Sequence, residues 1–197
     1  MSELYSLASI YTPYEPILNW RVKKENCTLL IHIINNYFVQ ALPDEPSVNM
    51  ISSISKILCW TLHNKIPVFY SAQPGSMPVD QRGLLAALGA EVRMIKEERR
   101  IIDELLSNPD NVVTKKWRYS AFYQSNRAEM LRLRSCDSLS ITGIYTPVDY
   151  FATAREPFCG DIHPLIVADG VADFSLFGHQ KSMDYSYIST SDVVAYE

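Results

Sequence analysis

Short β-branched runs alternate with longer amphipathic segments along this chain, and that alternation constrains its fold more than any other feature. Residues 27–34 read CTLLIHII, a nearly continuous apolar run typical of a strand covered on both faces. Strands that alternate with helices indicate an α/β fold, with a mostly parallel sheet and helices on both faces. Further strands are predicted at residues 66–70, 112–114, 138–145, 164–168 and 192–196, and helices at 47–64 (Ser47 as N-cap), 91–107 and 127–134.

The carboxyl ends of the predicted strands are the expected ligand site, because parallel α/β sheets bind ligands at that edge. The side chains there are suited to a small polar ligand: an amide, a planar cation, a segment of cations beside aromatic residues, and a carboxylate. They are Gln73, Arg82, residues 115–122 and Asp149. Structural interpretations remain open, since Arg82 could be a solvated helix arginine, residues 115–122 a surface basic patch and Asp149 a loop-stabilising residue.

Composition and charge exclude several classes of protein. The 197 residues are 47% hydrophobic and 20% charged, which is typical of a globular chain rather than a disordered one. A formal net charge of -4 offers no basic excess, so we expect neither nucleic acid nor a membrane surface as a partner. No apolar run approaches the ~20 residues that a membrane-spanning helix needs. The N-terminus lacks the pattern of a signal peptide.

Cysteine spacing and the lack of known cofactor motifs narrow the chemistry further. The four cysteines show no metal-ligand spacing, so we expect reduced thiols in a cytoplasmic protein. No glycine-rich phosphate loop, GxSxG or HExxH motif is present, and we therefore expect no cofactor and no metal.

Five ordered motifs resemble those of the isochorismatase family, especially its members in siderophore and phenazine pathways. The resemblance covers roughly residues 14 to 190. The motifs are LIHIINNYF (30–38), IPVFYSAQPGSMPVDQRGLL (66–85), TKKWRYSAF (114–122), GIYTPVDYFATA (143–154) and DIHPLIVADGVADFS (161–175). The resemblance implies a three-layer α/β fold with about six strands. It also implies one domain over residues 1–197, with an N-terminal arm at about 1–22 and no carrier-protein domain.

What the resemblance implies about chemistry divides the candidate residues in two. Family members hydrolyse a vinyl ether: an aspartate at the end of the first strand protonates the enolpyruvyl methylene, and water then adds. The positions that hold substrate are matched by Gln73, Arg82, Lys116 and Tyr145. The position of the acid is occupied by Ile33, and that of a nearby glutamine by Asn35.

Isoleucine neither donates a proton nor stabilises a cation, so Lys116 loses the carboxylate that the family places beside it. Asp149 replaces a family glycine on the pocket-lining loop, and we expect it to pair with Lys116. Lys116 and, more speculatively, Asp149 are therefore the candidate catalytic residues. The nucleophilic cysteine of the wider amidohydrolase branch falls at Tyr150 by the same comparison.

Three functions follow from this pattern. The first is a repurposed enzyme of secondary-metabolite biosynthesis that acts on a chorismate-derived or similar small carboxylate. The second is an inactive binding or partner subunit, and the third is a residual isochorismatase-type hydrolase with a relocated acid. The resemblance also implies a homo-oligomer, formed through the helices after the fourth strand, and another biosynthetic enzyme as a further partner.

Overall fold

The computed structural model describes residues 4–10, 14–15, 21–74, 77–88, 97–106 and 112–195. A six-stranded sheet lies at its centre, in the order β3-β2-β1-β4-β5-β6, and every neighbouring pair of strands is parallel. The predicted α/β fold is therefore confirmed. The strands are β1 (Cys27–His32), β2 (Val68–Ala72), β3 (Val112–Lys115), β4 (Ser138–Ile144), β5 (His163–Ala172) and β6 (Asp192–Val194).

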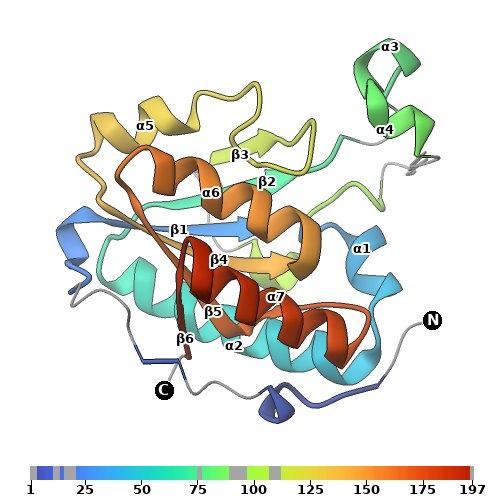
Figure 1. The fold of residues 1–197 in the computed structure, drawn as a ribbon, viewed down its shortest axis with the longest axis horizontal. Helices are drawn as coiled ribbons and strands as arrows, with labels where there is room; N and C mark the ends of the chain where they lie inside the picture. Colours follow the sequence, from blue (N-terminus) through green and yellow to red (C-terminus); the bar gives the residue numbers. More distant parts are fainter. Residues whose placement is uncertain are drawn as a thin grey trace.

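Helices cover both faces of the sheet, with α6 and α7 in front of it and α2 behind it (Figure 1). The α-helices are α1 (Asn36–Ala41), α2 (Asp44–His63), α3 (Val79–Arg82), α4 (Leu84–Ala87), α5 (Arg127–Leu133), α6 (Phe151–Cys159) and α7 (Leu176–Ser189). Shorter helical turns are Leu7–Ser9, Lys24–Asn26, Asp103–Leu105 and the π-helical Thr146–Tyr150. None of the described helices is long and apolar enough to cross a membrane.

Two helix predictions need correction. Helix α2 begins at Asp44 with Pro43 as its N-cap, so Ser47 is not a cap but a buried residue of the helix. Acidic residues in the first turn favour that earlier start because they interact with the positive end of the helix dipole.

The helix predicted at residues 91–107 does not form in its described part, residues 97–106. Ile101 instead makes an antiparallel bridge with Asn35, and the Ile102 amide donates to the Ile34 carbonyl at 3.1 Å. Ile101, Ile102 and Leu105 are all buried in the core. This apolar cluster packs against the segment after β1, and its tertiary contacts override the helical preference of the charged residues around it. Residues 91–96 and 107 lie outside the described residues.

Gly143 allows the ends of β1 and β4 to approach each other. Its φ is +116°, and a Cβ at this position would lie 2.0 Å from the His32 carbonyl oxygen. Only glycine combines that conformation with that approach. The close pairing of these two strand ends brings the segments after them to the same edge of the sheet.

The helices after the fourth strand leave large apolar side chains on the surface. Phe158 on α6 and Phe177, Tyr185 and Ile188 on α7 are all exposed. Apolar surface of this kind is typical of protein–protein contacts. The homo-oligomer that the sequence predicts through these helices stays a prediction.

Candidate active site

A pocket of about 310 Å³ lies at the carboxyl ends of the strands. Segments that follow the five neighbouring strands β1 to β5 supply its wall, as expected for a parallel sheet. Its polar or charged lining residues are Gln73, Lys116, Arg118, Tyr119, Tyr145, Asp149 and Asp173, and its apolar ones are Phe38, Leu85, Trp117, Pro147, Val148 and Phe174. Three predicted residues, Gln73, Lys116 and Tyr145, are thus brought together with Asp149.

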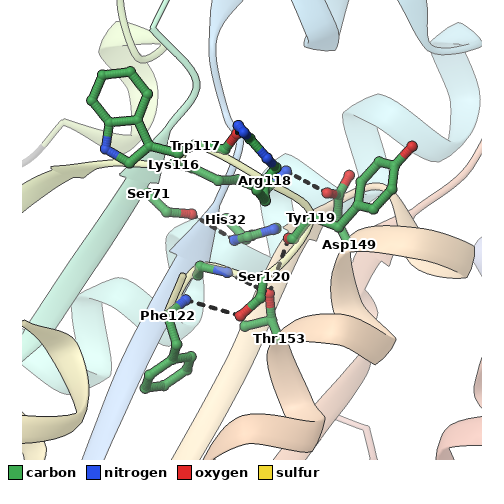
Figure 2. Close-up of polar contacts among 11 residues, drawn as sticks. His32, Ser71, Lys116, Trp117, Arg118, Tyr119, Ser120, Phe122, Asp149 and Thr153 are labelled. Carbon is green, nitrogen blue, oxygen red and sulfur yellow. Dashed lines mark hydrogen bonds and ion pairs between the residues drawn. The ribbon is translucent and has the colours of Figure 1, made fainter. Parts of the chain in front are cut away.

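Lys116 and Asp149 form a buried ion pair on the pocket wall, in which the Lys116 ammonium donates to Asp149 Oδ1. Figure 2 shows the lysine reaching this carboxylate from the segment after β3. The contact expected from the sequence is therefore present. The residue directly after β1 is the apolar Ile33, and the lysine after β3 contacts the segment after β4 instead.

Burial shifts both members of the pair toward their neutral forms. It raises the pKa of the Asp149 carboxyl and lowers the pKa of the Lys116 amine, although each charge favours the other and opposes these shifts. The ion pair and the neutral pair therefore lie closer in energy than in water. The Lys116 amine and the Asp149 carboxylate therefore share one transferable proton, and both residues line the pocket.

Aromatic rings form the wall beside the ion pair. Tyr145 packs between Phe174, with ring centroids 4.7 Å apart, and Phe38, with centroids 5.5 Å apart and edge-to-face geometry. Burial, followed by the charge of Asp149, raises the pKa of the Tyr145 phenol, which therefore stays protonated and able to donate a hydrogen bond. This arrangement suits a small ring that carries polar groups.

Ile33, Ile34 and Asn35, which directly follow β1, do not line this pocket in the described structure, although Phe38 of the next helix does. Ile33 is only 1% exposed and has a φ of +49°, a left-handed conformation that is uncommon for a β-branched residue. Asn35 is also buried, and its amide donates to the Arg99 carbonyl at 2.5 Å. Position 33, which the resemblance matches to the family's acid, thus holds a buried apolar side chain, and Asn35 binds the backbone at residues 99–101.

Two buried groups lie beneath the pocket wall. His32 Nδ1 is 2.5 Å from the Ser71 hydroxyl, and its pKa is well below the usual range because it is buried and lies near the charges of Lys116 and Arg127 (Figure 2). Tyr150 is fully buried with its ring edge-on to His32. Position 150 therefore belongs to the core, and it is position 149 that faces the pocket.

Arg82 is separated from the other predicted residues. It ends α3, which together with α4 projects from the body of the protein (Figure 1). Its side chain is absent from the described pocket wall, although Leu85 of the neighbouring α4 lines it. A cation at position 82 does not contact Lys116 or Asp149 in the described structure.

Sequence reasoning missed Asp173 and Phe174 because it ended the fifth strand at residue 168. The strand continues to Ala172, so these two residues follow its true carboxyl end. The signal was present, since the apolar run resumes at Val171 after only two residues, Asp169 and Gly170. Among the described residues, no group of three or more histidine, cysteine, aspartate or glutamate side chains could hold a metal ion.

Comparison with known proteins identifies the family. The isochorismatase domain model matches residues 26–195. The chain belongs to the isochorismatase family. This family member is 34% identical over 185 residues to the phenazine biosynthesis protein PhzD of Pseudomonas fluorescens, covering 90% of this chain and 89% of that one. It is 40% identical over 172 residues to the isochorismatase of Bacillus subtilis, covering 86% of this chain and 55% of that one.

Solved structures show the same fold for this isochorismatase-family chain. A cysteine hydrolase from Pseudomonas syringae pv. phaseolicola superposes with a TM-score of 0.79 at 18% identity, covering 92% of this chain and 93% of that one. The N-carbamoylsarcosine amidase of Thermoplasma acidophilum gives a TM-score of 0.74 at 19% identity, covering 86% and 96%. At these identities the likeness concerns the fold alone.

Proposed function

We propose that this chain is an enzyme of secondary-metabolite biosynthesis that acts on a chorismate-derived or similar small carboxylate, with Lys116 and Asp149 as its proton-handling pair. The observation that carries the proposal is the buried contact between these two side chains on the pocket wall. Of the functions that the sequence leaves open, this geometry favours an isochorismatase-type hydrolase with a relocated acid. The similarity to phenazine and siderophore proteins supports the pathway assignment.

In this mechanism Asp149 takes the proton of the pair and gives it to the methylene carbon of an enolpyruvyl ether. The electron pair of the carbon–carbon double bond forms the new C–H bond, and the positive charge is shared with the ether oxygen. The carboxylate left on Asp149 then stabilises this cation, an electrostatic contribution that is large in a pocket with little water. Water adds to the cation and gives a proton to the neutral Lys116 amine, and the hemiketal collapses to pyruvate and a ring alcohol as its hydroxyl proton moves to the leaving oxygen.

The remaining pocket residues have binding roles in this proposal. Gln73 offers both an acceptor and two donors, and the Tyr145 phenol offers a donor beside an aromatic wall. Lys116 holds the proton beside Asp149 in the free protein and becomes a neutral amine once that proton has passed to the substrate. This amine can then accept a proton from the water that adds, which restores the pair.

A non-catalytic binding protein is the second candidate. The observation that favours it is the position of Arg82, which lies outside the described pocket wall that its match in the family helps to form. A protein of this kind would bind the small carboxylate without releasing pyruvate from it.

The decisive experiment measures pyruvate release from isochorismate and from its 2-amino analogue with a coupled assay. We expect the wild type to release pyruvate, and Asp149→Asn to lower the rate about 10²–10⁴-fold, which is the usual contribution of a positioned general acid. Asp103→Asn, at an exposed aspartate that pairs with Arg100 outside the pocket, is the matched control and should retain most of the rate. Binding of either compound without pyruvate release would establish the second candidate instead.

A further inference from the structure

Arg118 connects the pocket wall to the α3–α4 hairpin, which comprises residues 79–87. Its guanidinium Nη1 donates to the Gln81 carbonyl of the hairpin at 2.8 Å and to the Trp117 carbonyl at 2.7 Å. The same guanidinium lies over the ring of Tyr123, 5.4 Å from its centroid. The Trp117 carbonyl and the Tyr123 ring thus hold Arg118 on the body of the protein, while its guanidinium also binds the Gln81 carbonyl of the hairpin.

Because Gly83 has no side chain, the Arg118 guanidinium can pack closely against the hairpin. A Cβ at position 83 would lie 2.6 Å from Arg118 Nη2, and the φ of Gly83 is +55°. The guanidinium therefore packs directly on the bare Cα at the junction of α3 and α4. The contact between Arg118 and the hairpin combines a charge-assisted hydrogen bond with close packing.

Apolar burial contributes little to holding the hairpin. The side chains of Val79, Leu84 and Leu88 are 67%, 84% and 69% exposed. Leu85, in contrast, lines the pocket, and Arg82 lies in the same hairpin. The hairpin therefore forms part of the pocket wall while most of its large apolar side chains remain in solvent.

We propose that Arg118 is a positioning residue, which holds the α3–α4 hairpin against the pocket and thereby sets the affinity for substrate. The kinetic half of this proposal rests on the proposed function, whereas the structural half concerns the hairpin alone. Because Arg118 is placed at the rim and the proton-handling pair lies deeper, removal of the guanidinium is expected to change KM more than kcat.

The test compares Arg118→Met, which keeps the aliphatic stem, with Arg155→Met, a control at an exposed arginine of α6. Hydrogen exchange is measured on the amides of residues 79–88 in the protein without substrate. We expect exchange there to be at least about tenfold faster in Arg118→Met than in the control, since a hydrogen bond to a charged group is lost. Arg118→Lys keeps the charge without the planar fork and should give an intermediate rate.

Kinetics with isochorismate complete the test. We expect KM to rise about tenfold in Arg118→Met, with kcat changed less than about threefold. Unchanged exchange in residues 79–88 would overturn the proposal, and so would faster exchange with an unchanged KM in an active enzyme. If the wild type releases no pyruvate, the proposed function fails, while faster exchange in Arg118→Met still supports the structural role of Arg118.

Discussion

The ends of β1 and β4 lie side by side in the sheet but have opposite character. The segment after β1 holds Ile33 and Asn35, both buried and outside the described pocket wall. The segment after β4 brings Asp149 to that wall, in contact with Lys116. The difference teaches that the lysine after β3 can take its carboxylate from beyond β4, two strands further along the sheet than β2, because parallel strands deliver their carboxyl ends to one edge.

The largest expected effect comes from removing one member of the Lys116–Asp149 ion pair, so that the other charge has no partner. Lys116→Met strands the Asp149 carboxylate in the interior, so we expect the free energy of unfolding to fall by about 3–5 kcal/mol. The double variant Lys116→Met/Asp149→Leu removes both charges and should recover most of that loss. Urea denaturation at pH 7 measures both. If the double variant loses as much unfolding free energy as Lys116→Met and Asp149→Leu lose together, the two charges are not coupled.

Moving the carboxylate back to β1 sharpens the comparison. Position 33 already has the left-handed backbone that aspartate adopts more readily than isoleucine does. In the Asp149→Asn background, we expect Ile33→Asp to raise the rate of pyruvate release at least about tenfold. This would recover part of the 10²–10⁴-fold contribution of a general acid. The measurement is the coupled assay on the double variant, with Ile33→Asn in the same background as control. Equal rates for these two would show that β1 no longer places a carboxylate near the reacting atoms.

The pH dependence of activity follows from the raised pKa of Asp149. Burial keeps the carboxyl protonated to higher pH than an exposed aspartate, and a reaction that needs the protonated form slows as the pH rises through that pKa. Above it, kcat should fall about tenfold for each pH unit. Asp149→Glu should retain a falling limb, whereas Asp149→Asn should lose it. A profile that is flat for the wild type would assign the proton to another group.

The smallest expected effect concerns the β1 side. Ser71→Ala removes the partner of His32 Nδ1 and leaves a buried ring nitrogen without its hydrogen bond. We expect a loss of about 1–3 kcal/mol in the free energy of unfolding, with little change in the rate of pyruvate release. Denaturation and the coupled assay together check this. A large loss of kcat with normal stability would mean that the β1 end takes part in the chemistry.

The candidate site was predictable where it depends on strand ends. Gln73, Lys116 and Tyr145 follow runs whose β-branched pattern is plain in the sequence, and all three line the pocket. Asp173 was missed because the predicted strand ends at residue 168, whereas β5 continues to Ala172. Arg82 was matched to the family by sequence, but its place depends on a hairpin held by Arg118 from a distant segment.

By itself, the sequence determined the parallel α/β fold, the edge of the sheet that carries the pocket and the membership of the isochorismatase family. These follow from local patterns of apolar residues and from motifs that keep their order. Only the tertiary structure decided that residues 97–106 pair with the segment after β1, that Tyr150 turns into the core and that Arg82 stays outside the described pocket wall. Each of these depends on contacts between segments far apart in the chain, whose energies outweigh local preference.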